Sequence, residues 1–446
     1  MNNHTFLKDK NYLLLFFGKL VSGIGSRVYG FGIGLYLLDL TGLASSLASY
    51  ISIWAVVLFI AGPIAATFTD RWSNKVRVLY LTDYGRGFAY LLIALGVWYF
   101  SNLGNTEMVM LVIYTGLVVI GIQTAFFNPA SVALIPQLVD GDELVSASSI
   151  MQITRSVQNI LGLSLGALLY ITIGIVPLMI INGCSFLLSA FSEMFIRFKV
   201  PKNIERIEKE KETLINEEKT VGALAYIKRI YNDLFNAVKY MTVDAKPILM
   251  ITFIILISTT LGAPWFSIGV PYMLKQYFTF ADGFKPEYIL ASAEFAEGIG
   301  IILLSLVVSA IAVKYKIYQL IRIGASLFVL LGTSYFIIVY FFDIELFATQ
   351  TFVYTFVALN FVAGGINAIV NAPLDAAMQK YIDPSKIGKV GTLMDTFGSL
   401  LFPVTALLAG LMIDNISMYI PMFMMIFGML LITFISFRSK ELKKLI

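Results

Sequence analysis

The stretch Ala66-Thr67-Phe68-Thr69-Asp70-Arg71-Trp72-Ser73-Asn74-Lys75 separates two long apolar runs in the first quarter of the chain. These runs cover residues 44–69 and 78–100, and each is longer than the roughly 20 apolar residues that a helix needs to cross a bilayer. A short charged segment between two such runs is typical of a tight connection on one side of a membrane. The stretch therefore predicts two membrane-spanning helices joined by a polar loop.

The composition of the whole chain extends this interpretation. Of its 446 residues, 58% are hydrophobic and only 13% are charged, whereas a soluble domain averages about 25% charged residues. The first apolar run is too long for a secretory signal and lacks a small-residue cleavage site. We expect an all-α polytopic membrane protein with about twelve transmembrane helices. The remaining expected spans are residues 11–40, 107–127, 144–173, 176–198, 247–274, 288–313, 318–342, 346–372, 387–413 and 416–437.

Three parts follow from the spacing of these spans. Residues 1–198 form an N-terminal six-helix bundle, residues 199–246 a cytoplasmic linker, and residues 247–446 a C-terminal six-helix bundle. Apolar residues recur at helical spacing in the second part of the linker, which predicts an amphipathic helix on the cytoplasmic leaflet. A plain connection between the halves is the alternative. The recurring positions are Leu224, Ile227, Ile230, Tyr231, Leu234, Phe235 and Val238.

The two halves show signs of an internal duplication. Pro177 and Pro421 each open the last span of their half, at an offset of 421 − 177 = 244 residues. Two related bundles that meet at a pseudo-two-fold axis are typical of alternating-access carriers, whose substrate binds near the midplane. The same offset relates Gly18 to Gly262, Gly25 to Gly269, Gly121 to Gly365, Pro129 to Pro373 and Gly166 to Gly410.

Basic residues predict the orientation of the chain, because cytoplasmic connections carry an excess of lysine and arginine. One set of connections contains only Lys275 and Lys285. The other set is therefore expected in the cytoplasm, which places both termini inside the cell and the protein in the inner membrane. That set contains Lys8, Lys10, Arg71, Lys75, Arg77, Lys199, Lys202, Lys314, Lys316, Lys380, Lys386, Arg438, Lys440, Lys443 and Lys444.

The loop at residues 66–75 resembles the cytoplasmic signature Gly-x-x-x-Asp-Arg-x-Gly-Arg-Lys of the major facilitator superfamily. Asp70, Arg71 and Lys75 match it, while Ala66, Ser73 and Asn74 depart from it. The resemblance implies a latch in which Asp70 meets the positive end of the eleventh helix, near residues 385–388. A carboxylate at a helix N-terminus is stabilised by about 0.3–1 kcal/mol. Capping of a helix end by Asp70 and Arg71 is the alternative.

Further motifs are similar to the drug:proton antiporter-like branch that contains macrolide-efflux permeases and enterobactin exporters. The resemblance implies proton-coupled export, and it adds Asp83 and Arg86 to the latch. Gly162 and Gly166 match the antiporter signature of the fifth helix, although Leu163 stands where that signature has proline. The other matching segments are residues 127–130, 134–139, 182–190 and 388–390.

Ionisable and amide residues inside the expected spans indicate a polar passage. A charge at the bilayer centre costs about 2.5–3.5 kcal/mol and normally faces the protein interior. Residues three or four apart share one face of a helix, so the N-terminal residues form stripes on the first and fifth helices. These residues either line a cavity for an anionic or zwitterionic part of the substrate or hold helices together. The candidates are Lys19, Ser22, Ser26, Arg27, Gln152, Arg155, Gln158, Asn159, Asn360, Asn367 and Asn371.

Carboxylates in the C-terminal half are the candidate proton carriers: Glu294, Glu297 and Asp395. The single histidine, His4, lies in the N-terminal tail, so a histidine relay inside the membrane is excluded. A salt bridge or a wet vestibule is the alternative role of the two glutamates. Glu193, near the end of the sixth span, is expected at the membrane interface.

The sequence thus predicts a secondary transporter, with export of an amphipathic small molecule such as a drug, macrolide-like compound or siderophore. The alternatives are an uptake carrier or facilitator for an anionic or zwitterionic metabolite, and a membrane scaffold or receptor. An enzyme is not expected, because no Walker phosphate-binding loop and no metal-ligand spacing occur. The expected partners are the substrate and the lipid bilayer, without nucleic acid, metal or cofactor beyond the proton gradient. We expect a monomer.

Overall fold

The computed structural model describes residues 5–72, 74–139, 143–197, 235, 238–243, 245–281, 283–312, 315–382, 390, 394 and 401–445. Every regular element within these residues is helical, which confirms the all-α prediction. The expected amphipathic linker helix falls almost entirely outside the described residues. So does much of the first half of the expected eleventh span, whose residues 401–413 are described.

Six helices make up the N-terminal half, hereafter the N-half. Short polar side chains begin several of them by accepting otherwise unpaired backbone N–H groups: Asp9 accepts from Asn11 at 2.8 Å, and Asn105 accepts from Met108 at 3.0 Å. The six helices are α1 (Lys10–Thr41), α2 (Ala44–Arg71), α3 (Lys75–Asn102), α4 (Thr106–Leu138), α5 (Leu144–Ile173) and α6 (Ile175–Glu193).

The C-terminal half, hereafter the C-half, begins with a helix that changes its winding. α9 (Lys246–Ile257) continues through the π-helical segments η3 (Ser258–Gly262) and η4 (Trp265–Gly269), then α10 (Val270–Tyr272) and the π-helical η5 (Met273–Tyr277). Pro264 and Pro271 lie in this stretch, and each removes a backbone donor from the helix. The later helices are α11 (Pro286–Ala312), α12 (Ile317–Asp343), α13 (Thr349–Tyr381), α15 (Phe402–Asn415) and α16 (Ile420–Arg438).

The helices have the length and surface of membrane spans. Within the described residues, nine are long and apolar enough to cross a bilayer. α1 and α3, with 32 and 28 residues, also exceed the hydrocarbon thickness of about 30 Å at 1.5 Å per residue. Large apolar side chains such as Leu92, Leu188 and Phe427 remain exposed on the outside of the bundles. Lipid is the solvent that such a surface requires, so the chain is a multi-pass membrane protein.

Corresponding helices in the two halves have matching lengths. α4 and α13 each contain 33 residues, and their starts and ends share one offset (349 − 106 and 381 − 138, both 243). α6 and α16 each contain 19 residues at an offset of 245 (420 − 175 and 438 − 193). Both of the longer helices contain an internal proline, Pro129 in α4 and Pro373 in α13. The predicted pair of pseudo-symmetric bundles is thereby confirmed.

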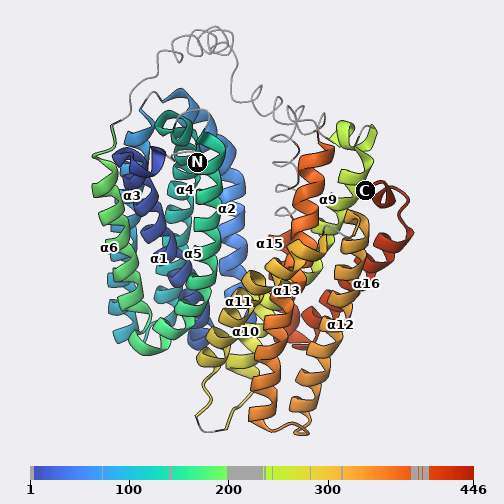
Figure 1. Ribbon diagram of the computed structural model, residues 1–446. Helices are drawn as coiled ribbons and strands as arrows, with labels where there is room; N and C mark the ends of the chain where they lie inside the picture. The colour runs from blue at the N-terminus through green and yellow to red at the C-terminus, as the bar shows by residue number, and fades with distance from the viewer. Residues whose placement is uncertain are drawn as a thin grey trace.

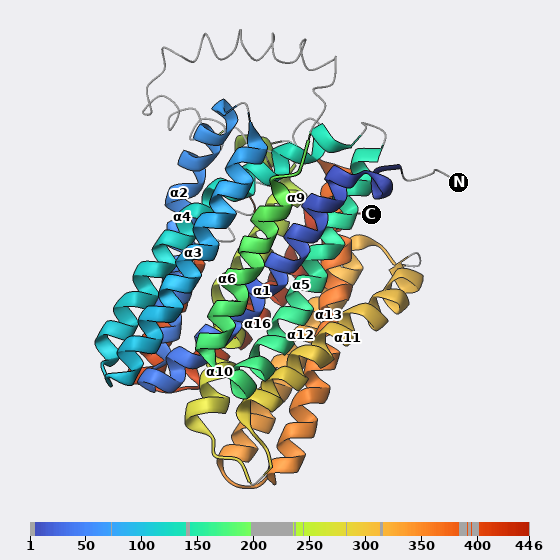
Figure 2. The same cartoon turned by 90° about the vertical axis from the view of Figure 1, so that its left-hand side faces the viewer.

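The two halves stand side by side, and both ends of the chain lie on one face of the molecule (Figure 1). We call this the terminal face and the other side the opposite face. The described parts of the halves diverge toward the terminal face and come together near the opposite face (Figure 1). In the view turned by 90°, α1, α5 and α6 lie in front of C-half helices (Figure 2).

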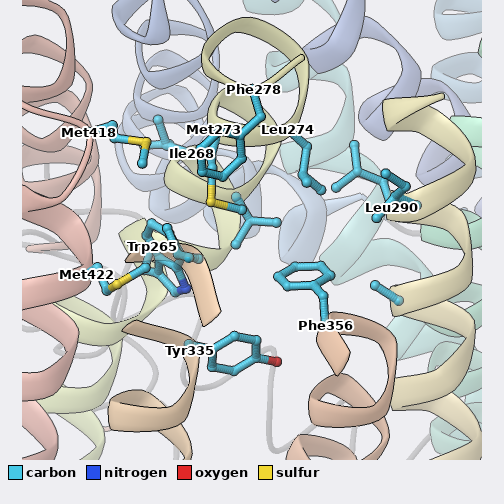
Figure 3. Packing of buried hydrophobic residues seen from close by; sticks show 14 of the residues in the cluster. Trp265, Ile268, Met273, Leu274, Phe278, Leu290, Tyr335, Phe356, Met418 and Met422 are labelled. Carbon is cyan, nitrogen blue, oxygen red and sulfur yellow. The ribbon is translucent and has the colours of Figure 1, made fainter. Parts of the chain in front are cut away.

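One hydrophobic core joins the halves near the opposite face. Buried side chains of the C-half, including Trp265, Met273 and Tyr335, pack together there (Figure 3). Leu35 and Ala48 of the N-half belong to the same cluster. This shared core holds the bundles together on one side and leaves the space between them on the other.

Candidate functional site

A cavity of about 1180 Å³ lies between the halves. Its wall includes residues of α1, α2, α4 and α5 from the N-half, and of the α9–η5 stretch, α11, α12, α13 and α16 from the C-half. Aromatic side chains such as Trp54, Phe266 and Phe328 line it together with charged ones. A cavity of this size exceeds the usual range of about 300–1,000 Å³ for small-molecule sites, so it has room for a drug-sized compound and water.

The N-half wall of the cavity is basic. Lys19, Arg27 and Arg155 all line it, as does Gln158. The side-chain amide of Gln158 donates to the Lys19 carbonyl oxygen at 2.7 Å and so ties α5 to α1. Six of the residues predicted for this wall therefore line one surface, because Ser22 and Ser26 also line it.

Two glycines allow α5 to approach α1 behind this wall. A methyl group at Gly162 would collide with the side chain of Arg27, and one at Gly166 would lie 2.9 Å from the Val28 carbonyl oxygen. Small residues at such a spacing let helix backbones come close together inside membranes. The glycine pair predicted from the fifth span therefore sets the position of Arg27 beside α5.

The C-half wall of the cavity is acidic. Glu294 and Glu297 on α11 both line it, and so does Asn367 on α13. The side-chain amide of Asn367 donates to Oε1 of Glu297 at 3.0 Å. α11 and α13 touch through their backbones here, because a methyl group at Gly364 would collide with the Glu297 carbonyl oxygen and lie 2.7 Å from the Ile301 nitrogen. This close contact places the amide within reach of the carboxylate.

Other predicted site residues lie elsewhere. Asn159 and Asn371 are exposed but do not line the cavity, and Asn360 is buried, where it donates to the Phe356 carbonyl oxygen at 2.9 Å. Positions three or four apart spread over a broad helix face, so only part of each stripe reaches the cavity. Asp395 lies outside the described residues, and the side chains of Gln152, Asp70 and Arg71 do as well. Lys75 is buried and donates to the Thr69 carbonyl oxygen.

Asp83 and Arg86 form an ion pair within α3, and both side chains are buried in the N-half. The guanidinium of Arg86 lies over the rings of Phe127 and Phe186, 4.1 and 4.4 Å from their centroids. Arg86 also reaches the cavity wall. Both segments that supply these rings, residues 127–130 and 182–190, were noted from the sequence, but their packing around Arg86 required the structure.

The structure adds site residues that the sequence reasoning did not select. Ser131 and Asn128 on α4 line the cavity, and Lys19 donates to Ser131 at 3.1 Å. Glu193 is fully buried inside the N-half rather than exposed at an interface. Its position near the end of a span gave no sign of this, because burial depends on the neighbouring helices α1 and α3.

Polar contacts close the cavity at the opposite face. Lys275 at the end of the α9–η5 stretch pairs with Asp39 of α1 at 2.6 Å and with Glu287 of α11. Tyr170 donates to the same Asp39 carboxylate at 2.5 Å. Gln276 donates to the Leu38 carbonyl oxygen at 2.8 Å. The contacts of Lys275 with Asp39 and of Gln276 with Leu38 cross from one half to the other.

A second set of contacts joins α2 to α15. The Asp414 carboxylate accepts the backbone N–H groups of Ala44 at 2.7 Å and Ser45 at 2.9 Å. Ser52 donates to the Pro403 carbonyl oxygen at 2.7 Å. A methyl group at Gly410 would lie 2.9 Å from the Ser45 Cα atom, so the two helices touch closely. Together with the Lys275 contacts, this packing seals the cavity toward the opposite face.

Two matched halves of membrane-spanning helices, with a cavity of charged and aromatic side chains between them, define a membrane transporter, not an enzyme. The Major Facilitator Superfamily model matches residues 15–348, and the chain belongs to that superfamily. It is 25% identical over 429 residues to the uncharacterized MFS-type transporter YkuC of Bacillus subtilis (strain 168), which covers 92% of this chain and 88% of that protein. It is 24% identical over 420 residues to macrolide efflux protein A of Streptococcus pyogenes, covering 92% of each chain.

Solved structures share the fold. A bacterial homologue of the iron transporter ferroportin in an inward-facing state superposes with a TM-score of 0.69 and 14% identity, over 97% of this chain and 98% of that one. A D-xylose–proton symporter superposes with a TM-score of 0.65 and 11% identity, over 95% and 96%. At these identities the likeness establishes the arrangement of helices alone.

Proposed function

We propose that this chain is a proton-coupled exporter of an amphipathic small molecule, which works by alternating access. The observation that carries the proposal is the carboxylate pair Glu294 and Glu297 in the wall of a cavity between two pseudo-symmetric halves. Rocking of such halves about a central site exposes that site to each side of the membrane in turn. A carboxyl group at the site can then collect a proton on one side and release it on the other.

The terminal face is the cytoplasmic side in this proposal, and the membrane is the bacterial inner membrane. Basic residues in the connections support the orientation: Lys316 precedes α12, Lys380 lies in the last turn of α13 and Arg438 ends α16. Both ends of the chain lie on the terminal face (Figure 1). The described conformation then opens inward, with the Lys275 and Asp414 contacts on the outer side. Substrate enters from the cytoplasm or the inner leaflet.

Proton coupling is assigned to the C-half carboxylates. The only histidine of the chain is His4, which precedes the first helix. Glu297 is held by the Asn367 amide, and Glu294 lies one turn away on the same helix. In the outward-open state a glutamate takes up a proton, and in the inward-open state its O–H bond breaks and the proton passes to water. Asp395 remains a third candidate carrier.

The cavity chemistry supports an amphipathic substrate. Aromatic rings offer apolar surface, and the basic N-half wall faces the acidic C-half wall. A molecule with an apolar body and a charged group fits such a lining better than a small sugar does. The similarity to macrolide efflux protein A, at 24% identity, supports a drug-like substrate and export. Asp70, Arg71, Lys75, Asp83 and Arg86 form the cytoplasmic latch in this proposal, and the carrier acts as a monomer.

The test uses purified protein in proteoliposomes with an imposed proton gradient and radiolabelled erythromycin as the probe. We expect Glu297→Gln or Glu294→Gln to abolish gradient-driven transport while expression stays normal. Glu107→Gln is the control, because Glu107 is exposed at the start of α4 and lies outside the cavity. Full gradient-driven transport by both cavity variants would remove the carboxylate assignment.

An uptake carrier or facilitator for an anionic or zwitterionic metabolite is the second candidate. Lys19, Arg27 and Arg155 support it, because none of them forms an ion pair within the described residues. The direction of transport in inverted and right-side-out vesicles distinguishes the two candidates. Accumulation of the probe in inverted vesicles supports export.

A further inference from the structure

A group of charged side chains lies inside the N-half, apart from the cavity glutamates. Glu193 ends α6 and Asp83 lies on α3, and both side chains have an exposed fraction of 0%. Two cations are close to them: Arg86 on α3 and Lys19 on α1. Neither carboxyl group lines the cavity, whereas both cations do.

The cations of this group already have partners. Arg86 pairs with Oδ1 of Asp83 and lies over the rings of Phe127 and Phe186. The Lys19 ammonium group donates to Ser131 at 3.1 Å. Arg155 of α5 faces Lys19 and repels it. No other charged group of α1, α3 or α5 is found to act on Glu193 within the described residues.

Glu193 forms no ion pair within the described residues. Its partner within the described residues is the Ser189 hydroxyl, which donates to Oε1 at 3.5 Å, and no described cation lies within 4 Å of it. Oε2 of Glu193 and Oδ2 of Asp83 are both buried without a hydrogen-bond partner among the described residues. α1 packs directly against the group, because a methyl group at Gly18 would lie 2.8 Å from the Ser189 hydroxyl.

An ionised carboxylate in such a place is costly. A buried charge needs both a counter-charge and hydrogen bonds, and a group that lacks them becomes neutral instead. Two carboxyl groups that share one site hold one proton between them more easily than they hold two negative charges. A protonated carboxyl group also has an O–H donor, which can form a hydrogen bond to a buried oxygen of the other carboxyl group.

We propose that Glu193 and Asp83 form a second proton-binding site, which holds one proton in the described conformation. The site is separate from Glu294 and Glu297, so it does not depend on their role. With one proton bound, one of the two carboxyl groups is neutral. The cations Lys19 and Arg86 and the remaining carboxylate then give the group one net positive charge next to the cavity wall. Release of the proton, by breaking the O–H bond and transfer to water, would make the group neutral.

The experiment is infrared spectroscopy of the full-length protein in lipid nanodiscs, without substrate. The variant Glu294→Gln/Glu297→Gln serves as the background, so that the cavity glutamates give no signal. We expect a C=O stretching band of a protonated carboxyl group at neutral pH, which shifts in D₂O. Adding Glu193→Gln should remove this band, whereas adding Glu107→Gln, at an exposed carboxyl group, should leave it unchanged.

Further variants make the result decisive. Loss of the band in Glu193→Gln or in Asp83→Asn supports the shared site, and a band of unchanged intensity in both overturns it. Ser189→Ala keeps both carboxyl groups and removes the described hydrogen bond to Glu193. It should keep the band but change its frequency. If Glu193→Gln does not fold, an unchanged frequency in Ser189→Ala overturns the proposal.

Discussion

The Asp414 carboxylate of the C-half caps α2 of the N-half at Ala44, with an oxygen–nitrogen distance of 2.7 Å. The first N–H groups of a helix have no partner within the helix, and a negative charge there is favoured by about 0.3–1 kcal/mol. The second carboxylate oxygen binds the Ser45 N–H at 2.9 Å. The contact crosses between the halves, so the proposed opening of the opposite face would break it.

Asp414→Asn should therefore shift the carrier toward the state that is open at the opposite face. Loss of about 0.3–1 kcal/mol corresponds to a roughly two- to five-fold change in the ratio of the two states. Spin labels at Asn102 and Ile416, both exposed on the opposite face, would report it as a larger population of long distances. The labelled protein carries Cys184→Ser to remove the native cysteine.

The control for this measurement is Asn415→Asp, which adds a carboxylate next to Asp414. The Asn415 side chain donates to Leu411 within its own helix, so this change should leave the Asp414–Ala44 contact in place. An identical distance distribution for wild type and Asp414→Asn would show that the cap does not contribute to closure.

The positions of most of the described membrane-spanning helices could be predicted from the sequence. The span expected at residues 144–173 agrees with α5 at both ends, because hydrophobic length and charged connections fix a membrane helix locally. The expected end at residue 127 was wrong for α4, which continues to Leu138. Pro129 and Pro136 both lie inside this helix, so neither proline ends it.

The site was predictable only in part. Lys19, Arg155 and Glu297 could be selected because an ionisable residue inside a span needs polar surroundings. Glu193 was not, because its burial is set by α1 and α3, which are distant in sequence. The pairing of Asn367 with Glu297 likewise depends on the close contact of α11 with α13, and periodicity on one helix cannot reveal its neighbour.

Close packing of α11 on α13 gives a prediction about stability. Gly364→Val would force a side chain against the backbone of Glu297 and Ile301, where no flexible group can move aside. Overpacking costs about 1–3 kcal/mol and sometimes more. We expect a lower melting temperature of the detergent-solubilised protein by intrinsic tryptophan fluorescence, with weaker transport because Glu297 is displaced.

Gly62→Ala is the matched control for that substitution. A methyl group at Gly62 meets no atom within 4 Å, although the residue lies inside α2. Alanine favours a helix over glycine by about 0.5–1 kcal/mol, so this variant should melt at the same temperature or a higher one. Equal melting temperatures for Gly364→Val and the wild type would refute the packing argument.

The charge of the N-half wall gives the last prediction, which concerns selectivity. Tetraphenylphosphonium and tetraphenylborate have the same shape and opposite charges, so their binding ratio isolates electrostatics. Arg155 lines the cavity and forms no ion pair within the described residues. At about 10 Å and an effective dielectric constant of 20–80, one unit charge contributes about 0.4–1.7 kcal/mol. Arg155→Gln should therefore raise the ratio of cation to anion affinity by about 4- to 300-fold, because the two probes respond in opposite directions.

Arg77→Gln removes an exposed arginine outside the cavity and should leave the ratio unchanged. Equal ratios in Arg155→Gln and the wild type, measured by isothermal titration calorimetry, would mean that the N-half wall does not sense substrate charge.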